Sequence, residues 1–406
     1  MQVQVFDVSH VKYPVVHQAL DKANIEQTSG NPDAQILWWD GDIHSKDFDI
    51  LGPTQRINKI PGMDYICFKS TTIHAMNQMQ RLFPQLYTFI PQSFLLPHQL
   101  GDLQRFHAKL QSRSRKPITW IVKPRNECCG HGIRLIQHLY ELQMKTEPVV
   151  VQRYISPYLL EGYKFDFRFY LLISSLAPYT VFLYREGLAR FCTHKYVEPN
   201  PSNLGDRFAT LTNTSVNVEN SEASIDYTRL SSSVLADISK IDGRGPALWG
   251  KICDLCRLSA LAIWPQIVSS INQHTSRHRF YRKLTSSTTL DSYSRYFHLL
   301  GIDIMLNETC NPVFIELNDR PSMIVTFECE KALKENLIYD CFTCLSPDGS
   351  AVAPSKISPN WDRLLPVPPG SPASSSVDQI ILQTASIFRT TAANRERPHY
   401  EKHGSL

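Results

Sequence analysis

Charged and aromatic side chains alternate along residues 163–170, which read Tyr-Lys-Phe-Asp-Phe-Arg-Phe-Tyr. Side chains in a strand repeat every two residues, so Lys164, Asp166 and Arg168 share one face and the phenylalanines share the other. Two cations and a carboxylate beside an apolar floor are suited to binding phosphate groups and their counter-ions. The alternative is an exposed sheet face on which these charges form salt bridges.

Two apolar runs, 301–306 and 313–318, are joined by a short polar turn and predict a hairpin. If pairing is centred on the middle of the turn, Asp303 lies directly opposite Glu316, and the two-residue period adds Asn318 to the same face. Carboxylate and amide oxygens are ligands that suit magnesium carrying nucleotide phosphates. The alternative is a pair of edge carboxylates in water, which is less consistent with strands that are otherwise apolar.

A lysine ends a third apolar strand, 119–124, and a glycine pair follows it at Gly130 and Gly132. Lys123 can reach over a bound phosphate, and the glycines allow backbone N–H groups to approach it. A glycine pair alone is a weak signal, and it gains value here from its position just after the strand-end lysine.

Together these segments resemble the parts of an ATP-grasp ligase, and the chain is similar to the tubulin tyrosine ligase-like family, most closely its polyglutamylase branch. The resemblance covers about residues 35–345. It implies an α/β (α+β) ATP-grasp fold with N-terminal, central and C-terminal lobes. The motifs that carry it are 55–63 (QRINKIPGM), 120–124 (WIVKP), 151–155 (VQRYI), 163–168 (YKFDFR), 183–191 (LYREGLARF), 211–213 (LTN) and 314–322 (FIELNDRPS).

The resemblance also implies roles for individual residues. Lys123 and Lys164 would contact ATP phosphates, and Arg168, with Lys164, would act in catalysis by stabilising the transferred phosphoryl group and the acyl-phosphate. The magnesium ligands would be Asp303, Glu316 and Asn318. The remaining implied ATP-binding residues are Cys129, Gly130, Gln152, Arg153, Tyr154 and Ile155, with the last four beside the adenine, and Asp166, Thr212 and Asn213 at the nucleotide and ribose.

Four positions expected around the incoming amino acid are Thr180, Thr214, Ser215 and Val218. Compared with polyglutamylases, Thr180 replaces an arginine that grips glutamate, and Thr214 and Val218 replace a tyrosine and a lysine. Cys129 replaces an arginine before the glycine pair. Because charge-assisted hydrogen bonds are the strong ones, the loss of two cations weakens recognition of a dicarboxylic amino acid.

The implied reaction activates a carboxylate as an acyl-phosphate with ATP and Mg²⁺, and an amine then attacks to form an amide. The implied partners are the acidic tails of tubulin and a free amino acid, with glutamate as first choice. Alternatives are a ligase of the same fold using another amino acid or acceptor, or a catalytically weakened microtubule-binding relative. The resemblance implies a location on cytoplasmic microtubules, including those of a cilium or basal body.

Basic runs at 105–116 and 277–283 could form a patch for such acidic tails, although solvated runs of this kind are equally common. The second run is interleaved with aromatic residues, but it accompanies no RNA-binding signature, so a nucleic-acid partner is not favoured.

The elements that must position these residues follow from periodicity. We predict helices at 68–84, 101–117 and 248–270, strands at 118–123, 149–153, 164–174 and 180–184, and the hairpin at 299–318. The predicted domains are an N-terminal lead-in (1–60), a central lobe (61–148), a C-terminal ATP-grasp lobe (149–345) and a flexible Pro/Ser-rich tail (346–406), in which 380–382 could dock as a short helix.

Composition sets the limits of these expectations. The 406 residues are 42% hydrophobic and 20% charged, which is typical of a globular protein with two or three lobes, and the net charge of +4 identifies no partner. No signal peptide or membrane-spanning run is expected, and ten cysteines favour a reduced intracellular protein. Two CxxC pairs, Cys253/Cys256 and Cys341/Cys344, are too widely separated for an ordinary zinc site.

Overall fold

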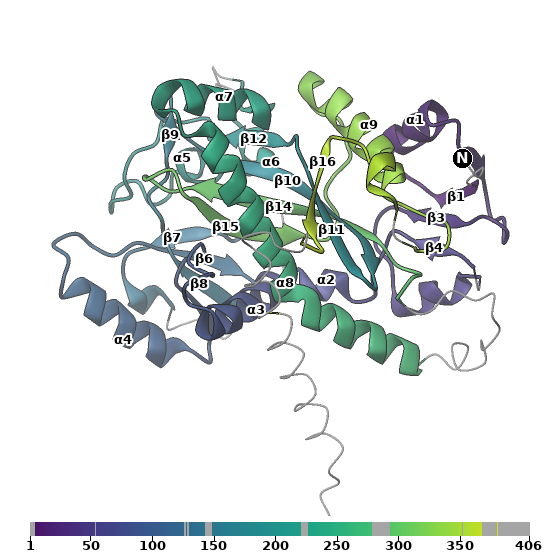
Figure 1. The fold of residues 1–406 in the computed structure, drawn as a ribbon. Coiled ribbons are helices and arrows are strands. Elements are labelled where there is room, and N and C mark those ends of the chain that lie inside the picture. Colours follow the sequence, from purple (N-terminus) through teal and green to yellow (C-terminus); the bar gives the residue numbers. More distant parts are fainter. Residues whose placement is uncertain are drawn as a thin grey trace, which may run out of the picture.

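The structure is a computed structural model, and its elements are grouped in three sheets with helices between and around them (Figure 1). It describes residues 5–52, 54–125, 127, 130–142, 148–220, 226–277, 293–350, 352–367 and 380. The short helical elements are α2 (Met63–Ile66), α5 (Arg207–Thr210), α6 (Thr214–Asn217) and the 3-10 turns Ser45–Ile50, Leu139–Leu142 and Pro354–Lys356.

The N-terminal lobe is a parallel sheet in the order β2-β1-β3-β4. Its strands are β1 (Val5–His10), β2 (Glu26–Thr28), β3 (Ile36–Trp39) and β4 (Arg56–Ile57). Helix α1 (Pro14–Lys22) packs against α9 (Glu328–Thr343), where Lys22 pairs with Glu335 at 3.3 Å (Figure 1). The N-terminal lobe therefore packs against a helix that lies about 300 residues further along the chain.

The second sheet is antiparallel in the order β5-β8-β6-β7. Its strands are β5 (Ser93–Leu96), β6 (Trp120–Pro124), β7 (Arg134–Ile136) and β8 (Val149–Arg153), and α4 (Leu100–Gln111) packs against β5. Because β8 pairs with both β5 and β6, the predicted boundary at 148/149 is wrong. The central lobe extends through Arg153.

The third sheet contains eight strands and is organised around β10 (Tyr163–Leu176), which pairs with β9, β11, β12 and β14. The others are β9 (Leu159–Leu160), β11 (Tyr179–Tyr184), β12 (Leu188–Phe191), β13 (Thr228–Leu230), β14 (His298–Leu306), β15 (Pro312–Asn318) and β16 (Trp361–Leu365). Phe165, Phe167 and Phe169 are fully buried on one face of β10, as the alternation predicts.

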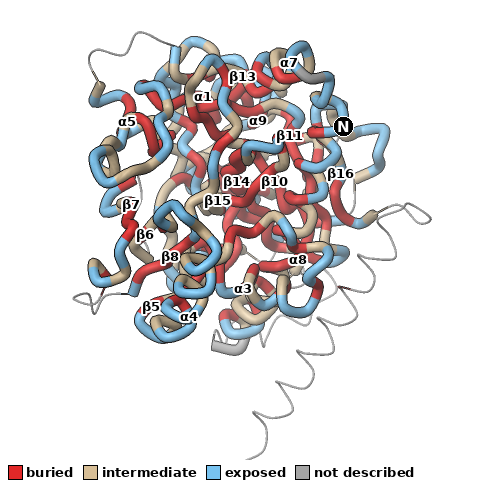
Figure 2. Tube along the Cα trace, turned by 90° about the vertical axis from the view of Figure 1, so that its left-hand side faces the viewer, coloured by how far each residue is buried: buried red, intermediate tan, exposed pale blue. Residues whose placement is uncertain are grey.

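Helix α8 (Gly245–Arg277) crosses this sheet and provides much of the main core, with α7 (Ser231–Asp242) and α3 (Lys69–Leu82) beside it (Figures 1 and 2). Among the described residues, α8 is the one helix long and apolar enough to cross a membrane by length and composition, a test that core helices of soluble proteins also pass. Its residues Ile252, Ile263 and Ile267 are fully buried against the sheet and α3, so α8 acts here as a core helix.

The predicted helices and strands are confirmed with shifts of up to seven residues at their ends, the largest at the C-terminal ends of α4 and α8. The predicted tail is wrong for its first part, because β16 pairs with β11 at the edge of the third sheet. Asp362 of β16 accepts hydrogen bonds from Arg185 at 2.7 Å and Trp249 at 2.9 Å. Ile380 is buried in the main core, and residues 368–379 and 381–406 lie outside the described part.

The two CxxC pairs lie in different parts of the core. Cys256 belongs to the core around α8, whereas Cys341 and Cys344 belong to the one between α1 and α9. Burial raises the pKa of the Cys253 and Cys344 thiols to about 12, so neither is poised as a thiolate ligand.

Candidate functional site

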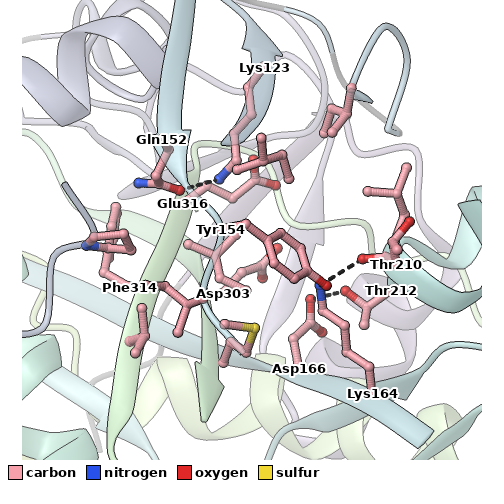
Figure 3. A pocket seen from close by; sticks show the side chains of 18 of the residues that line it. Lys123, Gln152, Tyr154, Lys164, Asp166, Thr210, Thr212, Asp303, Phe314 and Glu316 are labelled. Carbon is pink, nitrogen blue, oxygen red and sulfur yellow. Dashed lines mark hydrogen bonds between the residues drawn. The ribbon is translucent and has the colours of Figure 1, made fainter. Parts of the chain in front are cut away.

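A cavity that is partly open to solvent lies between the second sheet and the third (Figure 3). Eleven of the residues singled out from the sequence line it: Lys123, Gln152, Arg153, Tyr154, Ile155, Lys164, Asp166, Thr212, Asn213, Asp303 and Glu316. They come from segments as distant in sequence as β6, β10 and β15. The fold therefore gathers the predicted nucleotide site in one place.

Two buried lysines face each other across the cavity, Lys123 from β6 and Lys164 from β10. The ammonium of Lys123 donates to Gln152 Oε1 at 2.9 Å, and that of Lys164 donates to the carbonyl of Thr210 at 2.7 Å and the hydroxyl of Tyr154 at 3.2 Å. Neither forms an ion pair within the described part of the chain. Burial lowers the pKa of Lys123 to about 8 and also lowers that of Lys164, because a desolvated ammonium is disfavoured.

The carboxylates on the floor of the cavity are held by two arginines. Arg190 of β12 donates to both oxygens of Asp166 at 2.7 and 2.8 Å and also lies 2.8 Å from Asp303. Arg168 holds Asp303 through two bonds, one of them at 2.9 Å, and the Thr212 hydroxyl donates to Asp166 at 2.5 Å. Although burial alone would raise the pKa of Asp303, the two guanidinium groups hold it well below its usual value.

The hairpin places Asp303 of β14 directly opposite Glu316 of β15, as counting from the turn predicts. Nearer the turn the register shifts by one residue, so Ile304 pairs with Phe314. Glu316 forms an ion pair with Lys69 at the start of α3, at 3.1 Å. Both carboxylates therefore reach the cavity already paired with cations.

The glycine loop after β6 packs against the start of α6. At Gly130, whose φ is +77°, a Cβ would lie 2.9 Å from Val216 Cγ2 and 3.2 Å from Asn213 Oδ1. At Gly132, whose φ is +67°, a Cβ would lie 2.7 Å from the Pro124 ring. Backbone conformation and close packing both favour glycine here. Cys129 lies outside the described residues.

Several sequence-predicted residues do not line the cavity. Asn318 pairs with Gly301, two residue pairs beyond Asp303 and Glu316, and its Nδ2 is buried without a hydrogen-bond partner in the described part. Thr214, Ser215 and Val218 belong to α6 and its end, next to Asn213, and Val218 is exposed. Arg168 stands behind Asp303 rather than in the cavity wall.

Thr180 lies much further away. It pairs with Ser175 of β10, seven positions beyond Arg168, which is about 23 Å along a strand. Its hydroxyl donates to the carbonyl of Pro178 at 3.0 Å, near the end of the β10–β11 hairpin. This placement does not support Thr180 as part of an amino-acid pocket beside the nucleotide cavity.

Two charged residues of the site were missed from the sequence. Arg190 of β12 pairs in register with Asp166 of β10. A charged residue within an otherwise apolar strand is the same signal that identified Lys164 and Asp166, and it could have identified Arg190. Lys69 reaches Glu316 from the start of a helix, and no local pattern marks it.

The amino-acid sequence was compared with protein-family models and with curated proteins. A model of the tubulin-tyrosine ligase family matches residues 48–357. Tubulin polyglutamylase TTLL6 of Mus musculus is 31% identical over 347 residues, 84% of this chain and 40% of that protein. The corresponding values are 30%, 84% and 38% for tubulin polyglutamylase TTLL7 of Homo sapiens, and 33%, 74% and 42% for tubulin polyglutamylase ttll-11 of Caenorhabditis elegans. The chain thus spans about two fifths of the length of these curated relatives.

Proposed function

The chain belongs to the tubulin-tyrosine ligase family, and we propose that it is an ATP-dependent ligase that adds glutamate to glutamate side chains of tubulin tails. The predicted α/β ATP-grasp fold class is confirmed by this membership. The observation that carries the proposal is the pair Lys123 and Lys164, two buried cations with only neutral partners in a cavity whose carboxylates are all paired. Buried lysines in this state favour an anionic ligand such as a polyphosphate.

The proposed reaction has two steps. The γ-phosphoryl group of ATP is transferred to a glutamate carboxylate of the acceptor, and ADP leaves. The amine of the incoming amino acid then attacks the acyl carbon, phosphate leaves, the amine loses a proton, and an isopeptide bond remains. Lys123 and Lys164 bind the phosphates. Arg168, which lies behind Asp303 and outside the cavity wall, orients that carboxylate through its two bonds and does not contact the transferred group directly.

Asp303 and Glu316 supply a donor set that fits Mg²⁺, because opposed carboxylates on a hairpin are hard oxygen ligands. The third predicted ligand, Asn318, fits less directly, since it does not line the cavity, although its amide nitrogen is without a partner among the described residues. No group of three or more His, Cys, Asp or Glu side chains within the described ranges is arranged to hold a metal. When bound, the ion would neutralise phosphate charge.

Tubulin is proposed as the partner because the relatives named above are tubulin polyglutamylases. Lys109, Arg113 and Arg115 are exposed on and after α4 and have no ion pairs in the described part, so they offer a basic surface for an acidic tail. In the same run, Arg105 and Lys116 are paired with Asp102 and Glu198. Residues 278–283 of the second basic run lie outside the described ranges. The proposal places the protein on cytoplasmic microtubules.

The test is to incubate the protein with tubulin, ATP and, separately, glutamate, glycine or tyrosine, and to measure the masses of the tubulin tails. We expect ATP-dependent addition of glutamate, and loss of this addition in Glu316→Gln, which keeps the size of the side chain but not its charge. Addition of another amino acid would redirect the assignment to a different ligase. No addition by folded protein with any of the three would contradict the proposal.

A further inference from the structure

A second cationic feature lies just outside the cavity. Arg125 follows the last residue of β6, two positions after Lys123, and its guanidinium carbon lies 5.7 Å from the ring centre of Tyr65 and 5.6 Å from that of Phe68. The two rings pack edge to face, 5.6 Å apart. Tyr65 is 53% exposed, so this aromatic support stands at the surface.

Arg125 has no ion pair and no side-chain hydrogen bond within the described part of the chain, and its Nε is buried without a partner. Contacts with ring faces restrict a guanidinium without using its N–H donors. A guanidinium held in this way keeps a planar fork that matches a carboxylate, at a smaller entropic cost than a freely moving side chain.

The position of Arg125 connects it to the proposed reaction centre. Its carbonyl accepts a hydrogen bond from the Lys69 backbone N–H at 3.1 Å, and the Lys69 ammonium pairs with Glu316. A small cavity with room for about one water molecule shares Lys123 and Glu316 with the main one and reaches Lys69. The start of α3 therefore borders the phosphate-binding end of the site, and Arg125 contacts it through the Lys69 backbone N–H.

We propose that Arg125, supported by Tyr65 and Phe68, binds a carboxylate of an acidic acceptor polypeptide next to the side chain that is modified. This inference rests on the proposed function, because it assigns a role in acceptor binding at the same site. Phosphates have Lys123 and Lys164 inside the cavity, whereas Arg125 is partly exposed and lies beside the exposed Tyr65, where a polypeptide can approach its terminal nitrogens. A chain of glutamates presents several carboxylates, and one of them can pair with Arg125 while another enters the cavity.

The probe is a fluorescently labelled peptide of ten glutamates, and its affinity is measured by anisotropy without turnover. We expect Arg125→Gln to weaken binding about tenfold, which corresponds to about 1.4 kcal/mol for one charge-assisted pair. Arg125→Lys should give an intermediate loss, because charge is kept and the planar fork is not. The matched control is Arg81→Gln, which removes an exposed arginine at the other end of α3 whose Nε donates only within that helix.

Equal binding by wild type and Arg125→Gln, or no binding by wild type, would overturn the inference. So would an increase in the KM for free glutamate with peptide affinity unchanged, because the carboxylate would then come from the amino acid. The affinity for ATP should be the same in both proteins. If wild type binds the peptide through Arg125 but adds no amino acid, the proposed function fails and the acceptor site remains.

Discussion

The carboxylates and the lysines of the cavity are buried to a similar degree but are compensated differently. Asp166 and Asp303 each accept hydrogen bonds from Arg190, and Asp303 also holds Arg168, so these charges are balanced within the fold. Lys123 and Lys164 have a side-chain amide, a carbonyl and a phenol as partners. The first group stabilises the protein and orients its arginines, whereas the second keeps positive charge available for a ligand. We therefore expect substitutions of the carboxylates mainly to lower the stability of the fold, and substitutions of the lysines mainly to lower the affinity for ATP.

The largest effect is expected from Asp303→Asn. This substitution leaves the largely buried Arg168 without its carboxylate partner, and removing one partner of a buried ion pair costs about 3 kcal/mol or more. We expect the free energy of unfolding, measured in urea, to fall by that amount. The control is Glu198→Gln, whose pair with Lys116 is exposed on both sides and should change stability by less than about 1 kcal/mol. Equal stability of the two variants would show that the ionic network does not hold the fold.

The converse pattern is expected for Lys123→Met. The side chain keeps its length and loses a desolvated charge that has only an amide partner, so the free energy of unfolding should stay within about 1 kcal/mol of wild type. Affinity for ATP, measured by calorimetry, should fall by about tenfold or more, because a charge-assisted phosphate contact is lost. A stability loss as large as that of Asp303→Asn, with ATP binding retained, would remove the distinction between the two groups.

The titration of Lys123 sharpens the same contrast. Burial lowers its pKa to about 8, so ATP affinity should fall as pH rises above 8 and the ammonium loses its proton. The free energy of unfolding should instead rise with pH between 8 and 10.5. An unfolded lysine titrates near 10.5, so the unfolded state binds more protons than the folded state in this range. Unfolding measured from pH 7.5 to 10 should show a stabilising contribution that Lys123→Met lacks. An identical pH profile in the two proteins would contradict the assignment.

How far the site could be predicted depended on whether its residues share one strand or one hairpin. The two-residue period of β10 and the turn centre of the β14–β15 hairpin are local. Of the residues that they group, Lys164, Asp166, Asp303 and Glu316 line one cavity, whereas Arg168 does not. Arg190 was missed because the strand next to β10 cannot be identified from sequence spacing alone.

In the C-terminal lobe, too, the sequence does not show which strands pair. The Pro-rich flanks of 361–365 predicted a tail, but the exposed edge of β11 gives this short segment a pairing partner. Thr180 was assigned to the amino-acid pocket by resemblance. The register of the β10–β11 hairpin, which places it far from Arg168, depends on the length of β10 and on the turn that follows.

The smallest effect is therefore expected at Thr180. Thr180→Val loses one hydrogen bond to the Pro178 carbonyl, and the KM values for glutamate and ATP should remain within about twofold of wild type. The matched substitution Thr212→Val loses the bond to Asp166 in the cavity wall and should raise the KM for ATP by about fivefold, which corresponds to about 1 kcal/mol, the net contribution of a typical hydrogen bond. A glutamate KM that changes at Thr180 and not at Thr212 would mean that the amino acid binds near the hairpin end. The amino acid and the nucleotide would then occupy separate regions of the third sheet.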